Sequence, residues 1–90
     1  MRLRYSTRAR LQLAAIYEYL KERNARAATD VIASIRRAAE RLMQAAKLGM
    51  ETDEGSVRLL IEPEYLYRIF YEVRGREIFV VRISHRSHDW

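Results

Sequence analysis

The residues most able to do chemistry in this sequence are basic side chains in its C-terminal half. They are Arg58, Arg68, Arg82, His85, Arg86 and His88. A guanidinium can hold and neutralise a phosphate or a carboxylate, and a histidine can transfer a proton near neutral pH. The set therefore fits two functions: cleavage of a phosphate ester, or binding of an acidic partner without reaction. A solvated face is the ordinary alternative, because most strand arginines extend into solvent.

The sequence lacks the residues that other kinds of catalytic site require. The chain has no cysteine, which excludes disulfides, thiolate metal sites and a cysteine nucleophile. It contains neither a phosphate-cradling glycine loop nor a serine in a nucleophile elbow. His85, His88 and Asp89 come nearest to a metal cluster, but three such ligands at the end of the chain make a weak site. We therefore predict no metal and no cofactor.

A β-hairpin in residues 65–90 must position most of the basic residues. Two runs rich in β-branched and aromatic residues flank Arg74-Gly75-Arg76, and this is the strongest hairpin signal of the sequence. A two-residue turn at Gly75-Arg76 would place Arg68 opposite Ile83. Arg68 and His85 would then share one face of the sheet, whereas a three-residue turn would break this parity.

The same register sorts the neighbouring side chains between the two faces. Phe70 would lie opposite Val81. Arg82 would share its face with Ile78 and Val80, which favours an ordinary structural role for it. The other face of the first hairpin strand would carry Tyr67, Ile69 and Tyr71, which we expect in the core.

Two amphipathic helices precede the hairpin. Ser6 or Thr7 would cap the first helix, which runs to about residue 23, and Asn24 breaks the chain before a second helix over residues 25–47. The first helix carries apolar residues at helical spacing, namely Leu13, Ile16, Tyr17 and Leu20. The stripe on the second comprises Val31, Ile32, Ile35, Ala38, Ala39, Leu42 and Ala46. So short a connection predicts an antiparallel helix hairpin.

Two further strands complete the expected fold. Residues 1–5 alternate in polarity, and residues 57–61 form an apolar run that Pro63 ends. Residues 48–56 carry two glycines and three acidic residues and read as a long loop. The chain is therefore expected to be one α+β domain over residues 1–90, in the order β-α-α-β-β-β. Its helix hairpin would lie on one face of a mostly antiparallel four-stranded sheet.

The positive charge is unevenly distributed along the chain. The net charge is +5, but residues 1–50 hold eleven basic and four acidic residues, whereas residues 51–90 hold six and eight. A basic domain suggests nucleic acid or an acidic protein as partner. No segment approaches the ~18 apolar residues of a membrane span, and the first residues lack the apolar core of a signal peptide. Together with the absence of cysteine, this predicts a cytoplasmic protein that has no membrane partner.

The hairpin resembles the closing signature of the ParE/RelE toxins of bacterial type II toxin–antitoxin systems. The matching runs are Tyr67-Arg68-Ile69-Phe70-Tyr71-Glu72-Val73, Val80-Val81-Arg82-Ile83-Ser84-His85 and Asp89-Trp90. The first helix, with Ile16-Tyr17-Glu18-Tyr19-Leu20, and the alanine-rich second helix are similar to the ParE branch. The resemblance covers essentially the whole chain. It implies the fold predicted above and an acidic antitoxin as partner, in a homodimer or a toxin–antitoxin hetero-oligomer.

The two branches of this family differ in function. RelE-like members cut messenger RNA on the ribosome, whereas ParE-like members poison DNA gyrase without known catalysis. Arg68 matches the strand arginine with which RelE-like enzymes hold the phosphate, and Arg58 falls near the basic residues of their strand two. His85-Arg86 match the histidine or lysine, followed by arginine, in their C-terminal tail. Trp90 replaces the terminal tyrosine of that branch, and an indole can stack on a base but cannot exchange a proton as a phenol does.

Neither branch is matched completely. The strand-two lysines of RelE-like enzymes are missing. Arg86 stands where ParE-like members carry a small residue, and residues 47–56 lack their usual proline. Because the positive surplus lies on the helices rather than on the sheet, we favour a non-catalytic toxin that binds DNA gyrase. Its candidate target-binding residues are Arg58, Arg68, His85, Arg86 and Trp90.

Two alternatives remain. The first is a metal-independent, ribosome-dependent mRNA endonuclease, in which Arg68 and Arg86 would neutralise the phosphate and His85 or His88 would move a proton. The second is a small dimeric domain that binds nucleic acid through its basic helices, although no helix-turn-helix spacing supports it.

Overall fold

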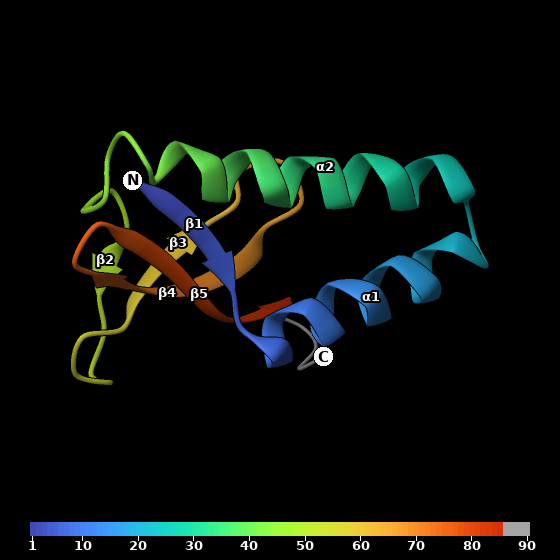
Figure 1. Cartoon of the computed structure of the whole chain (residues 1–90). Coiled ribbons are helices and arrows are strands. Elements are labelled where there is room, and N and C mark those ends of the chain that lie inside the picture. The colour runs from blue at the N-terminus through green and yellow to red at the C-terminus, as the bar shows by residue number, and fades with distance from the viewer. Residues whose placement is uncertain (86–90) are drawn as a thin grey trace.

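The computed structural model describes residues 1–85, and Figure 1 shows them as two layers, a helix hairpin and a twisted sheet. The helices are α1 (Thr7–Lys21) and α2 (Ala25–Arg41). The strands are β1 (Arg2–Tyr5), β2 (Met50–Glu51), β3 (Arg58–Ile61), β4 (Tyr67–Arg74) and β5 (Glu77–His85). In the sheet they follow the order β1-β5-β4-β3-β2, with β1 parallel to β5 and the other pairs antiparallel.

The predicted α+β class and the β-α-α-β-β-β order are confirmed, but the predicted number of strands is wrong. The described sheet has five strands, because Met50–Glu51 pairs with β3 inside the segment that we expected to be a loop. A two-residue strand is too short to produce an alternating pattern in the sequence. No helix in residues 1–85 is long and apolar enough to cross a membrane.

Both helices begin at side-chain caps, one at Ser6, which the sequence offered as a cap, and one at Asn24, where the sequence indicated a break. The Ser6 hydroxyl accepts a hydrogen bond from the Ala9 backbone N–H at 2.9 Å, and the Asn24 side chain accepts one from Ala27 at 3.1 Å. Each cap satisfies one of the backbone donors that the first turn of a helix leaves unpaired. The connection between the helices is short, as expected, so they form an antiparallel hairpin over the sheet (Figure 1).

The apolar stripe of α2 meets the covered face of the sheet. Ile35 and Leu42 are fully buried, and so are Ile69, Tyr71 and Ile83 on the strands. The predicted second helix is nevertheless too long, because α2 ends at Arg41 and the chain continues in turns. Ala46 still packs against the core, so the stripe continues past the end of the helix.

The tip of the β4–β5 hairpin is the predicted two-residue turn. Arg74 pairs with Glu77 across the hairpin, and Gly75 adopts the positive φ of 58° that the turn requires. Farther along, the predicted register is wrong. Tyr71 pairs with Val80, but Phe70 pairs with Arg82, so β5 holds one extra residue, Val81, which has no partner on β4.

This bulge changes which face each later residue occupies. Arg68 lies opposite Ser84 rather than Ile83, and Phe70 lies opposite Arg82 rather than Val81. Arg82 therefore moves to the uncovered face, away from Ile78 and Val80. The expected placement of Tyr67, Ile69 and Tyr71 in the core is confirmed.

Helix α1 supports the part of β5 that extends beyond β1. The Ser6 hydroxyl donates to the Val81 carbonyl at 2.7 Å, and the side-chain oxygen of Gln12 accepts from the Ile83 N–H at 2.6 Å. Gln12 is buried, so its amide replaces the strand partner that β1 no longer provides. The bulged half of the strand is thus held by side chains of the helix layer.

Candidate target-binding face

The face of the sheet opposite the helices carries arginines that are paired with carboxylates. Within residues 1–85, three ion pairs lie on this face: Arg4–Glu77 at 3.1 Å, Arg74–Glu72 at 2.7 Å and Arg82–Glu54 at 3.0 Å. The hydrogen bonds from these arginines are the main reason that the pKa values of the three glutamates fall below their usual range. The glutamates therefore stay ionised near neutral pH and neutralise the guanidinium groups beside them.

Two phenylalanines lie beneath these arginines. Arg4 and Arg74 lie over the Phe79 ring, with 4.4 and 4.1 Å between the guanidinium carbon and the ring centroid. Arg82 covers Phe70 at 3.7 Å. Stacking on an aromatic face fixes a guanidinium in position and shields the ring from water. Three arginines of the uncovered face, Arg4, Arg74 and Arg82, are thus already satisfied by their neighbours.

Arg68 differs from these arginines. It lies on the uncovered face in the middle of β4, between Ile61 of β3 and Ser84 of β5. Its side chain is half-buried and has no hydrogen bond, ion pair or ring contact with any other residue in the range 1–85. Ile61 beside it is 36% exposed. A cation next to exposed apolar surface can accept a carboxylate or a phosphate from another molecule.

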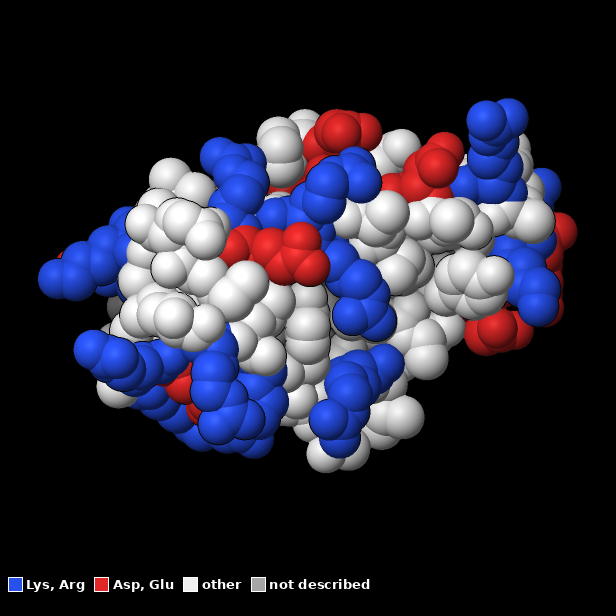
Figure 2. Space-filling view, turned by 45° about the horizontal axis from the view of Figure 1, so that its top comes forward, with Lys and Arg blue, Asp and Glu red and all other residues white. Residues whose placement is uncertain are grey.

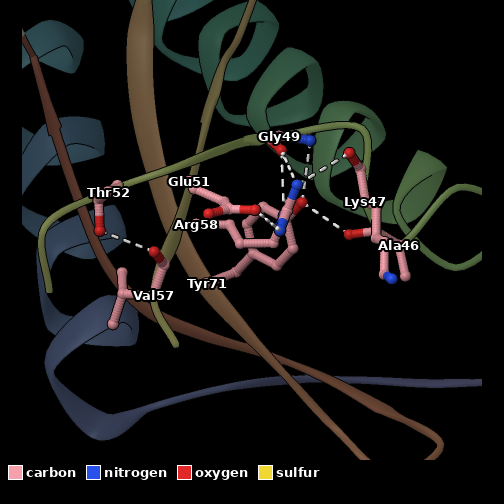
Figure 3. Close-up of polar contacts among 8 residues, drawn as sticks. All are labelled: Ala46, Lys47, Gly49, Glu51, Thr52, Val57, Arg58 and Tyr71. Atoms are coloured by element: carbon pink, nitrogen blue, oxygen red, sulfur yellow. Dashed lines mark hydrogen bonds and ion pairs between the residues drawn. The ribbon is translucent and has the colours of Figure 1, made fainter. Parts of the chain in front are cut away.

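Arg58 projects from the opposite face, toward the turn that follows α2 (Figure 3). Its guanidinium donates to the Gly49 carbonyl at 2.7 and 3.0 Å and to the Lys47 carbonyl at 3.3 Å. The Glu51 carboxylate lies 3.9 Å away. Arg58 therefore uses its donors to hold the chain between α2 and β2, a role that the sequence did not reveal.

Tyr71 holds the same turn from within the core (Figure 3). Its hydroxyl donates to the Ala46 carbonyl at 2.7 Å and accepts from the Gly49 N–H at 2.9 Å, and the side chain is fully buried. A Cβ atom at position 49 would lie 2.7 Å from the Tyr71 ring and 2.8 Å from the Leu59 carbonyl, so glycine is required by this close approach. We call Arg58, Tyr71 and Gly49 the turn clasp.

His85 does not join Arg68. It pairs with Tyr67 at the end of β5, and the two rings meet edge to face with 4.9 Å between their centroids. Side chains alternate along a strand, so Tyr67 and His85 occupy the face opposite to that of Arg68. The expectation that Arg68 and His85 share a face is therefore wrong, because the bulge at Val81 shifts the parity of β5.

The remaining candidates lie outside the described residues. They are Arg86, His88 and Trp90, together with Asp89 of the weak metal cluster. Within residues 1–85, no three histidine, aspartate or glutamate side chains are grouped so that they could hold a metal ion. The described part of the site is thus Arg68 with its apolar surroundings, beside a layer of paired arginines.

The glutamates that neutralise this layer were missed in the sequence. Glu77 and Arg4 meet because β1 lies parallel to β5. Once this strand pairing is known, the ion pair between the two residues can be expected. The Glu54 contact with Arg82 joins a loop to the bulged strand, and no pattern in the sequence indicates it.

Comparison with known proteins agrees with this architecture. Residues 3–90 match the family described as the ParE toxin of the type II toxin–antitoxin system parDE. A solved structure described as the chromosomal ParDE toxin–antitoxin system from P. aeruginosa contains a similar chain, with a TM-score of 0.85 and 25% sequence identity. The match covers 94% of this chain and 95% of that one. The search of curated proteins gave no match. The chain belongs to the ParE toxin family of type II toxin–antitoxin systems.

Proposed function

We propose that this chain arrests bacterial growth by binding and poisoning DNA gyrase in the cytoplasm, without catalysing a reaction. Gyrase is the target expected for the ParE branch, to which the family match assigns the chain. We further propose that an acidic antitoxin inhibits it, since the similar solved chain comes from a ParDE toxin–antitoxin system.

The observation that carries the non-catalytic part of the proposal is the state of the arginines on the uncovered face. A site that cleaves RNA needs cations that converge on the phosphate and are free to stabilise its developing charge. Here Arg4, Arg74 and Arg82 are each paired with a glutamate. A paired arginine leaves little charge for a substrate, so this layer is better suited to contact with a protein surface than to phosphate cleavage.

The uncovered face also offers the mixture of groups that protein interfaces use. Exposed apolar side chains lie on its β2–β3 side, where Met50 is 58% exposed and Ile61 is 36% exposed. Arg68 lies next to Ile61 and can pair with a carboxylate of the target. Arginine and aromatic residues with an apolar surround are typical of binding hot spots, so we also keep Trp90 as a proposed anchor.

The alternative function, ribosome-dependent mRNA cleavage, is favoured by one observation. Arg68 has no partner in residues 1–85, so it could hold a phosphate as its counterpart does in RelE-like enzymes. His85, however, lies on the other face of the sheet and cannot act beside Arg68 without rearrangement. Proton transfer would then depend on His88, which lies beyond the described residues.

Expression of the chain in bacteria without an antitoxin tests the proposal. We expect growth arrest with an induced DNA-damage response and intact mRNA. His85→Ala should weaken toxicity only modestly, because a binding toxin does not need this side chain to move a proton. Rapid mRNA cleavage, or a His85→Ala protein that is folded and wholly inactive, would favour the nuclease. A soluble, folded product that bacteria tolerate fully would remove the toxin function.

A further inference from the structure

Glu62, which directly follows β3, carries a fully buried carboxylate that no cation neutralises within residues 1–85. Hydrogen bonds take the place of the cation. The Ser34 hydroxyl and the Glu64 N–H donate to the Oε2 atom of Glu62 at 2.6 and 2.7 Å, and the Tyr65 N–H donates to its Oε1 atom at 2.9 Å. A buried charge strongly destabilises a fold unless such donors replace water. The turn from β3 to β4 therefore depends on these three donors.

The backbone of the same turn is strained. Leu66 adopts a φ of 65°, in the left-handed region that side chains such as leucine rarely occupy. Its N–H donates to the Glu62 carbonyl at 3.0 Å, and the Glu62 N–H donates to the Tyr67 carbonyl at 2.8 Å. A glycine at position 66 and a solvated residue at position 62 would form a hairpin turn without strain or buried charge. Because both are kept in one short turn, its geometry points to a function.

The turn connects two residues of the uncovered face. Ile61 and Arg68 are cross-strand partners in the last pair of the β3–β4 ladder, next to Glu62. Ser34 belongs to α2, so its bond to Glu62 joins this end of the ladder to the helix layer. Arg68 is the half-buried arginine that has no partner in residues 1–85. A fixed turn presents its guanidinium in one place, and binding is favoured when the target need not supply this order.

We propose that Ser34 and Glu62 are positioning residues of the target-binding site, which hold the turn that presents Ile61 and Arg68 to the target. The inference rests on the proposed function, in which Arg68 pairs with the target. Ser34 is 5% exposed and Glu62 is fully buried, so neither side chain contacts the target itself. Without their hydrogen bond the turn gains conformations, and the target must select the competent one at the expense of affinity.

A double-variant cycle with Arg68 tests the proposal. Ser34→Ala removes the hydroxyl but leaves both backbone bonds to Glu62. At equal amounts of folded protein in the cell, we expect it to weaken growth arrest about three- to tenfold. If Ser34 acts through Arg68, Ser34→Ala should have no further effect in the Arg68→Ala background. Ile35→Val is the matched control, because it loosens the packing of α2 without removing a hydrogen bond to the turn. It should arrest growth nearly as the wild type does.

Hydrogen exchange in the turn gives a second test that does not depend on toxicity. The Glu64 and Tyr65 amides should exchange about tenfold faster in Ser34→Ala than in the wild type, because the carboxylate that accepts their bonds is held less firmly. In Ile35→Val they should exchange at the wild-type rate. Glu62→Gln should accelerate exchange further, since its amide has one oxygen and its NH₂ group faces a backbone N–H in either orientation. Ser34→Ala decides the question if Glu62→Gln does not fold.

Three results would overturn the proposal. The first is a Ser34→Ala protein that arrests growth as the wild type does at equal amounts of folded protein. The second is a cycle in which the losses of Ser34→Ala and Arg68→Ala multiply, which would make Ser34 merely structural. The third is a wild-type exchange rate of the turn amides in Ser34→Ala. A wild type that does not arrest growth would instead remove the proposed function, and the exchange rates would then decide whether Ser34 and Glu62 hold the turn.

Discussion

Tyr71→Phe removes one oxygen atom from the turn clasp, and we expect it to destabilise the fold strongly. The hydroxyl donates to the Ala46 carbonyl and accepts from the Gly49 N–H, at 2.7 and 2.9 Å. The side chain and its bond to Gly49 are fully buried, so water cannot replace that bond without rearrangement, whereas the bond to Ala46 is only partly buried. Each orphaned backbone group costs about 1–3 kcal/mol. We therefore expect the free energy of unfolding to fall by about 2–4 kcal/mol, out of a total of roughly 5–10 kcal/mol for a small domain.

Urea and thermal denaturation followed by circular dichroism measure this loss. For a domain of this size, the melting temperature should fall by roughly 10–25 °C. Tyr17→Phe is the matched control, because the Tyr17 side chain is only half-buried, its hydroxyl has no hydrogen bond within residues 1–85, and the ring under Lys21 is kept. It should change the free energy of unfolding by less than ~0.5 kcal/mol. A Tyr71→Phe protein as stable as this control would refute the reasoning.

The double variant tests whether the turn clasp acts as one unit. Arg58 holds the Gly49 and Lys47 carbonyls of the same turn that Tyr71 holds. Once either residue is truncated, the turn can loosen, and the hydrogen bonds of the other residue then contribute less to the stability of the fold. The combined loss in Arg58→Ala with Tyr71→Phe should therefore fall short of the sum of the single losses by about 0.5 kcal/mol or more. Additive losses would mean that the two residues stabilise separate parts of the fold.

Three further outcomes follow from the structure. Ile35→Ala should destabilise the fold by about 2–5 kcal/mol, because Ile35 is a fully buried residue of α2; a near-neutral result in urea denaturation would contradict its place in the core. Arg68→Ala should reduce toxicity while the free energy of unfolding changes by less than ~0.5 kcal/mol, whereas Arg74→Ala, which breaks a pair already formed, should leave toxicity nearly unchanged; a large loss of stability would make Arg68 structural. The hydrogen bond from Arg4 lowers the pKa of Glu77 below its ordinary value of 4.5. The ionised Glu77 therefore contributes fully to stability above pH 4.5, and this contribution is lost as the pH falls through the lowered pKa. Glu77→Gln should therefore reduce the difference in melting temperature between about pH 6 and pH 3, and an unchanged difference would show that this pair does not contribute.

The sequence predicted those parts of the fold that depend on local patterns. Ser6 and Asn24 cap the helices because their side chains bond to backbone three residues ahead, and Gly75 is required by the turn itself. The buried stripe of α2 follows from helical spacing. Such features need only neighbours along the chain, so they can be found without knowledge of the tertiary structure.

The parts that the sequence did not predict depend on contacts between distant residues. The bulge at Val81 is marked by no glycine or proline, yet it moves Arg82 to the uncovered face and His85 away from Arg68. The end of α2 at Arg41 likewise reflects Tyr71, which holds the following turn from 25 residues further along the chain. One bulge was therefore enough to separate two residues that the sequence placed together in a candidate site.

The most direct test of the central claim is a pair of assays on the purified, folded chain. In the first, DNA gyrase supercoils relaxed plasmid DNA with and without the protein. In the second, ribosomes translate a defined mRNA in its presence. We predict inhibition of gyrase, weakened in Arg68→Ala, with the mRNA left intact. Ribosome-dependent cleavage of the mRNA with unaffected gyrase would contradict the proposed function.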